Sequence, residues 1–326
     1  MACGEFDLIS RYFQTQNVSR RDVNVPIGDD CAILTVPEGN QLAVTTDTLV
    51  AGTHFLACAP AELVAHKALA ANLSDLAAMG ATPAWVSLAL TLPEPDEAWV
   101  KAFCDGFFKL AEYFNVQLIG GDTTKGDVLS ITITAQGVVP AGTALTRGGA
   151  SIGDWVYVTG NLGDSAAGLD AILGGKNATL GMADVLCKRH YKRTPRVLAG
   201  QSLRSIASAC VDISDGLVSD LGHILNRSGV SAVVDAELLP MSAEFLSCYA
   251  NVDEARRIAL TSGEEYELCF TVSEQNKGAV QSALTHSGVS ATCIGQIRPG
   301  SGLKVMQGNR EVQWDLAGYD HFRSDK

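Results

Sequence analysis

The chain has 326 residues, of which 47% are hydrophobic and 18% charged, and a chain of this length usually divides into two domains. Its formal net charge of −12 argues against a surface for nucleic acid or an anionic membrane. A low aromatic content of 6% together with 32 glycines suits an α/β enzyme with many tight turns better than a disordered or fibrous protein.

Hydrophobic periodicity predicts helices and strands that alternate along the whole chain. Before the polar, Gly-rich connector at 147–154, we expect helices over 6–13, 61–79 and 96–114, and strands over 41–46, 84–92, 116–119 and 128–139, the last as an edge or hairpin strand. After it, we expect strands over 155–158, 232–234, 266–272 and 291–297, and helices over 195–206 and 217–227. The alternation predicts an α/β or α+β fold, with domains at 1–147 and 148–326.

Cysteine usage and the lack of a targeting segment point to the cytoplasm. The nine cysteines show no C-x-x-C spacing, and most, such as Cys210 and Cys269, lie in apolar runs where buried thiols are expected. The start of the chain does not have a basic segment followed by an apolar one, so no signal peptide is expected. The uncharged stretch 76–93 is interrupted by Gly80 and Pro83, which favours a helix end, a turn and a buried strand over a membrane span.

Acidic residues recur where apolar runs end. The carboxylates in this pattern are Asp30, Asp47, Asp75, Asp122, Asp212 and Asp215. Because ligands in α/β sheets bind beyond the carboxyl ends of strands, we expect these residues to converge on one cleft. A single Asp after a strand is equally well explained as a turn residue or helix cap. Several such motifs in both halves of one chain favour a shared site.

Carboxylate and hydroxyl oxygens are the ligands of Mg²⁺ rather than of Zn²⁺. Clustered carboxylates would repel one another and raise their pKa values, and divalent cations would relieve that repulsion while binding phosphates. Asp75 lies within a predicted helix, one turn after Asn72 and among apolar neighbours. Since Asp has a low helix propensity, metal binding explains Asp75 better than exposure to solvent does.

A Gly-rich turn at 159–168 follows a predicted strand and opens a helix. Backbone amides in such a position can bind an anion, although simple packing explains the turn equally well. The chain has no P-loop and none of the protein-kinase motifs. If ATP binds, a different scaffold must hold it.

A series of segments resembles the thiamine-monophosphate kinase family, in the order expected for that family and over about 4–322. The segments are 28–31 (Gly-Asp-Asp-Cys), 45–50, 72–80, 119–123, 145–147, 212–217 and 318–322. The resemblance implies transfer of the ATP γ-phosphoryl group to thiamine monophosphate, with several Mg²⁺ ions. It also implies the two-domain fold of the aminoimidazole-ribonucleotide synthetase superfamily. In that fold, an N-terminal ATP- and metal-binding domain pairs in a homodimer and a C-terminal α/β domain completes the active-site cleft.

The resemblance also implies roles for individual residues. The implied metal ligands are Asp30, Thr45, Thr46, Asp47, Asp75, Asp122, Asp212 and Asp215. The implied nucleotide contacts are Gly121, Asp122, Arg147 and Ser214, among which Asp122 and Arg147, together with Asp47, are the catalytic residues. The implied thiamine contacts are His54, Glu265 and Tyr319. The family usually has Gly-Glu-Asp-Tyr at 263–266, so the carboxylate of Glu265 is one methylene longer than expected.

Simpler explanations exist for three of these residues. Arg147 could form a surface ion pair, although its planar fork suits a phosphate. His54 could be a strand-surface residue. Tyr319 could pack the tail, although its ring could also stack on a cationic thiazolium.

Other functions remain open within and outside the superfamily. Aminoimidazole-ribonucleotide synthetase uses ATP to activate an amide. The hydrogenase-maturation relative is expected to end in a reactive Cys, whereas this chain ends in Arg-Ser-Asp-Lys. Selenide water dikinase needs a reactive residue in a Gly-rich setting that Cys3 does not have. A binding protein without catalysis would need fewer metal ligands.

Overall fold

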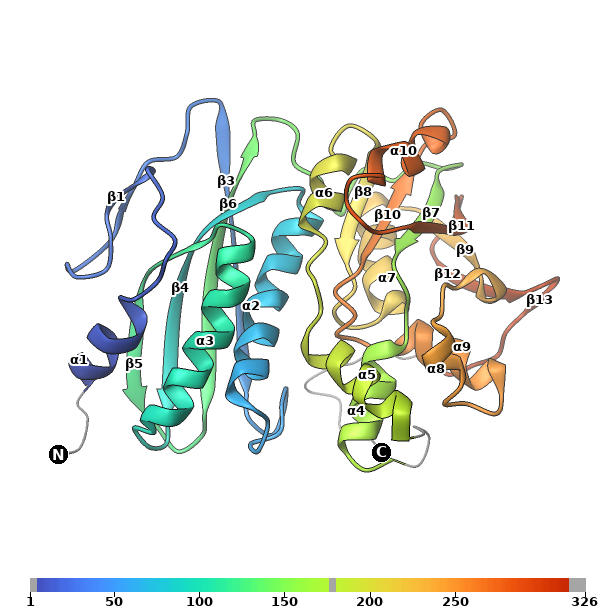
Figure 1. Cartoon of the computed structure of the whole chain (residues 1–326). Coiled ribbons are helices and arrows are strands. Elements are labelled where there is room, and N and C mark those ends of the chain that lie inside the picture. Colours follow the sequence, from blue (N-terminus) through green and yellow to red (C-terminus); the bar gives the residue numbers. More distant parts are fainter. Residues whose placement is uncertain (1–4, 176–179, 317–326) are drawn as a thin grey trace. The chain divides into compact units, whose positions relative to one another are not determined.

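The computed structural model describes residues 5–175 and 180–316 (Figure 1). The chain divides into two compact units. The first comprises residues 1–76 and 81–142, and the second comprises residues 77–80 and 143–326.

The first unit is a four-stranded sheet with two long helices. Its strands, in the order β3-β6-β4-β5, are β3 (Asn40–Val50), β6 (Ser130–Pro140), β4 (Thr82–Leu92) and β5 (Gln117–Lys125). Only β4 and β5 pair in parallel. The helices are α2 (Ala61–Ala78) and α3 (Glu97–Tyr113), preceded by the short α1 (Glu5–Leu8), the π-helix η1 (Ile9–Phe13) and the strand pair β1 (Val23–Val25) and β2 (Ile33–Leu34).

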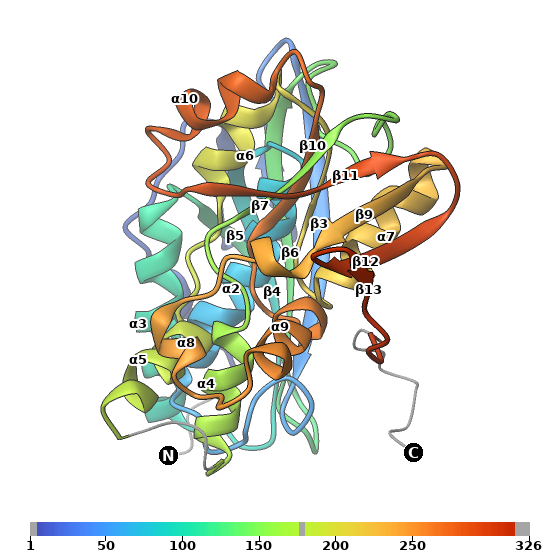
Figure 2. The same ribbon diagram turned by 90° about the vertical axis from the view of Figure 1, so that its right-hand side faces the viewer.

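The second unit is built around a seven-stranded sheet (Figure 2). Its strands, in spatial order, are β13 (Arg310–Glu311), β12 (Gly302–Gln307), β9 (Ser231–Asp235), β11 (Ala291–Arg298), β7 (Trp155–Thr159), β10 (Leu268–Val272) and β8 (Ala207–Asp212). Only β12 and β9 pair in parallel. The helices are α4 (Asp164–Ile172), α5 (Leu180–Tyr191), α6 (Val197–Leu203), α7 (Leu217–Ser228), α8 (Ala243–Leu246), α9 (Val252–Thr261) and α10 (Val280–Leu284), with 3₁₀ turns at η2 (Ala236–Leu238) and η3 (Lys277–Ala279).

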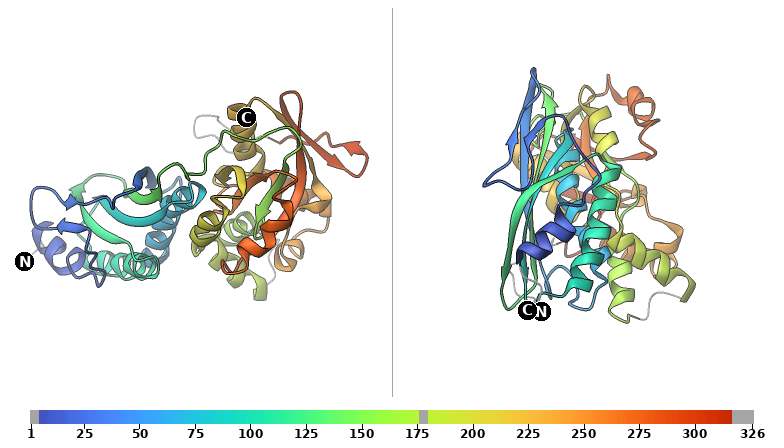
Figure 3. Two further views of the ribbon diagram at one scale, coloured as in Figure 1. Left: turned by 90° about the horizontal axis from the view of Figure 1, so that it is seen from above. Right: turned by 60° about the vertical axis from the view of Figure 1, so that its left-hand side comes forward.

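Helices α2 and α3 cover one face of the four-stranded sheet (Figure 3). Side chains alternate between the two faces of a strand, and along β6 every second residue is buried. On the other face Leu42 and Val44 of β3 are 48% and 57% exposed. Helix α3 begins at Asp96, whose carboxylate accepts hydrogen bonds from the amides of Ala98 and Trp99, as expected of an N-cap.

Helix α7 supplies much of the core of the second unit. Its apolar residues Leu217, Leu221 and Ile224 recur at helical spacing and are fully buried. They belong to the same core cluster as Val158 of β7 and Val211 of β8. The amphipathic pattern that predicted this helix is therefore the pattern that attaches it to the sheet.

The predicted elements are present, but some of their positions were wrong. The strands predicted over 41–46 and 116–119 continue to Val50 and Lys125, so Asp47 and Asp122 lie within strands rather than beyond them. Both sheets are mostly antiparallel, so their carboxyl ends do not meet at one edge. The stretch predicted as an edge or hairpin strand is β6, which is central and pairs with both β3 and β4.

The cysteines in the described ranges are free thiols. Cys210 and Cys269 are buried, as predicted, and burial raises the pKa of both thiols above the usual range. Cys31 and Cys58 are exposed. A thiol with a raised pKa is a poor nucleophile, so the buried pair has a packing role.

The uncharged stretch 76–93 forms the end of α2, a turn at Gly80 and the buried strand β4. Among residues 5–175 and 180–316, no helix combines the length and apolar character needed to cross a bilayer.

Replacing Phe103 with Ala is expected to lower the free energy of unfolding by roughly 3–5 kcal/mol, because a large buried ring would leave a cavity. The ring of Phe103 is 0% exposed and stacks between Trp99 and Phe107 on α3. Urea unfolding followed by circular dichroism measures the change. Tyr113→Ala in the same helix is the control, since Tyr113 is 72% exposed. Equal losses in the two variants would contradict this view of the core.

Candidate functional site

A cavity of about 930 Å³ lies within the first unit. Its walls include η1, the segment 27–32, β4 and β5. Three residues that the sequence predicted as site residues line it together: Asp30, Gly121 and Asp122. The cavity therefore joins a metal-ligand candidate from the N-terminal segment to two candidates from β5.

Gly121 is required by packing, whatever it binds. It pairs with Leu88 of β4, and a Cβ atom at Gly121 would lie 1.8 Å from the carbonyl oxygen of Leu88. No side chain fits there without separating the two strands. The glycine thus lets β5 approach β4 closely and places Asp122, the next residue, at the cavity.

Asp30 and Asp122 are the chemically distinctive groups of the cavity. Within residues 5–175 and 180–316, neither carboxylate forms an ion pair or accepts a hydrogen bond. Asp29 lines the cavity as well, and like charges that face one cavity repel one another. Oxygen ligands of this kind suit a hard divalent cation. The donor set therefore fits Mg²⁺.

Thr45 and Asp75 form a second group in the first unit. The hydroxyl of Thr45 on β3 donates a hydrogen bond to the carboxylate of Asp75 on α2. Asp47 lies two residues further along β3 and so on the same face as Thr45. Thr46 lies on the opposite face, where its hydroxyl is 2.9 Å from that of Thr134. The side chain of Thr46 is therefore not brought to Asp75.

His54 follows the end of β3 in a turn that is held by hydrogen bonds between its own residues. Its Nδ1 accepts a hydrogen bond from the amide of Val50 at 3.0 Å, so in a neutral ring the proton is on Nε2. Its carbonyl oxygen accepts a hydrogen bond of 2.8 Å from Nζ of Lys67. Lys67 is 1% exposed, and the sequence reasoning missed it. The available signal was a single Lys in an Ala- and Leu-rich helix.

In the second unit, Asp212 is the last residue of β8, and Ser214 and Asp215 follow it in the short connection to α7. The carboxylate of Asp220 accepts hydrogen bonds of 3.0 Å from the amides of both Ser214 and Asp215. Burial raises the pKa of Asp220 to about 7, although the hydrogen bonds and the positive charge of Arg147 act in the opposite direction. Arg147 is therefore an electrostatic neighbour of this segment.

Glu265 is buried inside the second unit, with 1% exposure. Its carboxylate accepts hydrogen bonds from the amides of Gly163 at 2.8 Å and Ser165 at 3.3 Å and pairs with Arg193. Two amides of the Gly-rich turn thus bind an internal carboxylate. This accounts for the turn by packing, the simpler of the two sequence interpretations. Burial raises the pKa of Glu265 to about 7, against the opposing charge of Arg193.

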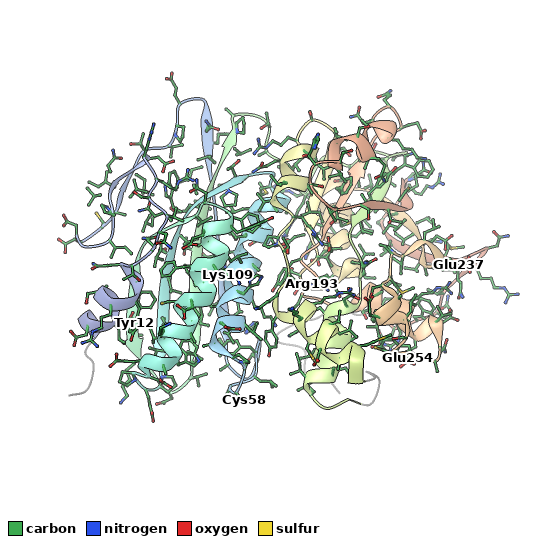
Figure 4. All side chains as sticks on the ribbon, viewed as in Figure 1. Tyr12, Cys58, Lys109, Arg193, Glu237 and Glu254 are labelled. Carbon is green, nitrogen blue, oxygen red and sulfur yellow. The ribbon has the colours of Figure 1, made fainter. Side chains whose placement is uncertain are left out.

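The sequence reasoning missed a set of buried ion pairs around this turn. Arg193, labelled in Figure 4, follows α5 and pairs with Glu265, and Arg196 pairs with Glu267. Arg189 of α5 pairs with the buried Asp164. The run of basic residues at 188–196 was the available signal, but the sequence alone did not reveal the partners.

The remaining predicted ligands are not gathered into one cluster. Among residues 5–175 and 180–316, no three His, Cys, Asp or Glu side chains lie close enough together to hold a metal ion. The candidates form smaller groups: Asp30 with Asp122, Thr45 with Asp75, and the segment 212–215. Tyr319 lies outside the described residues.

Replacing Glu265 with Gln should change how stability depends on pH. The pKa of Glu265 rises from 4.5 to about 7 on folding, so the folded chain holds the proton more tightly than the unfolded chain does. This contribution is fully present below the unfolded pKa and is lost as the pH rises through the folded one. The parent should therefore lose up to roughly 3 kcal/mol relative to Glu265→Gln as the pH rises between these two values.

Urea unfolding at a series of pH values measures this difference. Glu237→Gln serves as the control, because Glu237 is exposed in the same unit (Figure 4). A parent and a Glu265→Gln variant with parallel pH profiles would show that the folded pKa of Glu265 is not raised.

Models of protein families match both parts of the chain. The N-terminal domain of AIR synthase related proteins matches residues 28–139, and their C-terminal domain matches residues 151–308. The predicted two-domain fold, with helices and sheets mixed in both parts, is confirmed by these matches and by solved structures.

Curated relatives and solved structures agree with the family models over the whole chain. The thiamine-monophosphate kinase of Escherichia coli K12 is 56% identical over 326 residues, which cover 99% of each chain. That of Haemophilus influenzae Rd is 50% identical over 330 residues, which cover 100% of each chain.

The crystal structure of thiamine-monophosphate kinase from Stenotrophomonas maltophilia K279a has a TM-score of 0.85 at 45% identity and covers 94% of this chain and 97% of that one. AaThiL complexed with AMPPCP, an ATP analogue, and TMP has a TM-score of 0.78 at 33% identity, with coverages of 98% and 97%. The chain therefore belongs to the thiamine-monophosphate kinase family of the AIR synthase related proteins.

Proposed function

We propose that this chain phosphorylates thiamine monophosphate to thiamine diphosphate with ATP, the last step in making that cofactor. The observation that carries the proposal is the 56% identity to the Escherichia coli thiamine-monophosphate kinase across 99% of both chains. The 33% identical AaThiL has been solved with AMPPCP and TMP bound. The cavity lined by Asp30, Gly121 and Asp122 offers a place for an anionic ligand with its cation.

The proposed reaction is a direct in-line transfer. A phosphate oxygen of thiamine monophosphate attacks the γ-phosphorus of ATP, the bond from that phosphorus to the bridging oxygen breaks, and ADP leaves with the electron pair. A phosphate monoester has its second pKa near ~6, so the acceptor is already largely dianionic at neutral pH. No general base is needed, and catalysis consists of positioning and of offsetting the repulsion between two anions.

The cation that we propose is Mg²⁺. Asp30 and Asp122 are its best-supported ligands, because both line the cavity and neither has a positive partner within the described ranges. The rest of the proposed ligand set is Thr45, Thr46, Asp47, Asp75, Asp212 and Asp215, among which Thr46 is the least supported because its hydroxyl lies on the opposite face of β3 from Thr45 and Asp75. When bound, Mg²⁺ would neutralise phosphate charge and orient the transferring group.

Residues of both units serve this reaction in the proposal. The domain 1–147 would bind ATP and metal, and the domain 148–326 would complete the site. Arg147 would hold a phosphate, with Gly121 and Ser214 as further nucleotide contacts. Tyr319 would contact the thiamine moiety.

The structure supports different roles for the two other proposed thiamine contacts. Nδ1 of His54 accepts a hydrogen bond from the amide of Val50, which fixes the ring beside the end of β3, and His54 stays a proposed thiamine contact. Glu265 is buried and bonded to Gly163, Ser165 and Arg193. Its geometry therefore supports a role in fixing the Gly-rich turn better than direct contact with the substrate.

We also propose that the protein is a cytoplasmic homodimer that pairs through the outer face of the four-stranded sheet. This face carries the exposed Leu42 and Val44 beside the threonine pairs Thr46–Thr134 and Thr48–Thr132. Exposed aliphatic side chains on a flat surface are typical of an interface, and a two-fold axis lets one such face bind its own copy. The free thiols fit a reducing compartment.

The assay that tests the activity follows thiamine diphosphate by chromatography in mixtures of the protein, ATP, Mg²⁺ and thiamine monophosphate. Free thiamine and a metal-free mixture are the negative controls. Asp122→Asn is expected to lower kcat by at least about 100-fold, since it removes charge that acts on the transferring group. Asp127→Asn, an equal charge change at an exposed position just after β5, should keep the parent rate. Full activity of Asp122→Asn would refute the proposed metal ligand.

Replacing Val44 with Asp is expected to convert the dimer to monomers, because a charge would be buried without a partner at the interface. Sedimentation velocity measures the oligomeric state. Val128→Asp is the matched control, since Val128 is 50% exposed in the same unit and lies outside the strands. A parent chain that sediments as a monomer at all concentrations would rule out the proposed pairing.

A further inference from the structure

Asp220 is a buried carboxylate outside the proposed ligand set. It lies in the first turn of α7 and is 2% exposed. A single oxygen, Oδ2, accepts hydrogen bonds of 3.0 Å from the amides of Ser214 and of Asp215. Both donors precede the helix, whose N-cap is Gly216, so Asp220 does not cap α7 in the usual way.

The segment 213–215 is also fixed from its other side. The carbonyl of Ser214 accepts a hydrogen bond of 2.7 Å from the amide of Glu264, and that of Ile213 accepts one of 2.9 Å from Tyr266. A Cβ atom at Gly263 would lie 2.2 Å from the carbonyl oxygen of Ser214. The amide and the carbonyl of Ser214 are therefore both used inside the protein.

The backbone that approaches this segment is strained. Glu264 and Tyr266 have φ values of 60° and 50°, in the left-handed region that residues other than glycine avoid. Such strain persists only where contacts with the surrounding structure enforce the backbone conformation, and it is concentrated at functional sites. Here the hydrogen bonds to Ile213 and Ser214 hold it in place.

The side chains of Ser214 and Asp215 remain available. Each residue is half-buried, and in the described ranges neither the hydroxyl of Ser214 nor the carboxylate of Asp215 forms a hydrogen bond or ion pair. A ligand can therefore reach these two residues through their side chains, and not through the amides that Asp220 occupies.

We propose that Asp220 is a positioning residue for the nucleotide: it draws the amides of Ser214 and Asp215 inward and so presents their side chains to ATP and its metal ion. The proposal rests on the proposed function, since it assigns Ser214 and Asp215 to the nucleotide. It implies that Ser214 binds through its hydroxyl. It also implies that the two amide hydrogen bonds offset part of the cost of burying the Asp220 carboxylate.

The test compares Asp220→Ala, Asp220→Asn and a matched control in the full chain. Asp96→Ala is the control, because one carboxylate oxygen of Asp96 also accepts two backbone amides, those of Ala98 and Trp99, at an exposed helix start in the first unit. The readouts are the KM for each substrate, the calorimetric Kd for AMPPCP with Mg²⁺, and amide hydrogen exchange at residues 214 and 215.

Asp220→Ala should raise the KM for ATP and the Kd for AMPPCP by about tenfold or more, which corresponds to the loss of hydrogen bonds to a charged group. The KM for thiamine monophosphate should change by less than about twofold, a free-energy change well below that of one such hydrogen bond. Exchange at residues 214 and 215 should accelerate, while the rest of α7 keeps its protection. Asp220→Asn should be intermediate, because its amide oxygen can still accept both hydrogen bonds.

Unchanged AMPPCP affinity in both Asp220 variants would overturn the proposal, as would equal rises in both KM values with faster exchange along the whole of α7. If Asp220→Ala does not fold, Asp220→Asn decides by the same comparison. Failure of the proposed function is distinguishable: the parent would then form no thiamine diphosphate, while AMPPCP binding and hydrogen exchange would still report on Asp220.

Discussion

Carboxylates removed from bulk water need a positive charge or hydrogen-bond donors nearby, and this strongly acidic chain meets that need inside its second unit. In the second unit, Glu265 and Glu267 are neutralised by Arg193 and Arg196. In the first unit, Asp30 and Asp122 line a cavity, and no arginine or lysine pairs with either among the described residues. The first arrangement pairs buried charges inside the fold, whereas Asp30 and Asp122 are exposed to solvent, where a cation could reach them. This difference separates the structural acids from the candidate ligands more clearly than their positions in the sequence do.

Close backbone approach is the second constraint on the candidate site. A side chain at Gly121 would meet the carbonyl of Leu88, and one at Gly263 would meet that of Ser214. A side chain at Gly163 would meet the ring of Phe245. Each glycine lies next to, or in contact with, a residue that carries proposed chemistry. The Gly-rich fingerprints of the sequence thus have packing causes that apply before any ligand binds.

Periodicity predicted α3 and α7 because their apolar residues mark a single face, and it identified the strands in both units. Helix α2 was recognisable instead from its long Ala- and Leu-rich run, most of which is buried. Periodicity placed the ends of β3 and β5 too early, at 46 and 119, because Asp47, Gly120 and Asp122 have turn-like or polar character but lie in strands extended by pairing with their neighbours. The carboxylates of the candidate site were recognisable from motifs. Their partners were not, since Arg193 and Glu265 are separated by 72 positions and only tertiary folding reveals which charges meet.

Strand β5 forms one edge of the four-stranded sheet. An edge strand presents unpaired amide and carbonyl groups that another chain can extend, and proteins discourage this with charged side chains along the edge. Asp122 and Lys125 are exposed on β5, beside glycines that provide no steric barrier. Asp122, the proposed cation ligand, therefore also disfavours the pairing of this edge with another chain. A charge at position 122 thus has a structural reason in addition to the catalytic one that we propose.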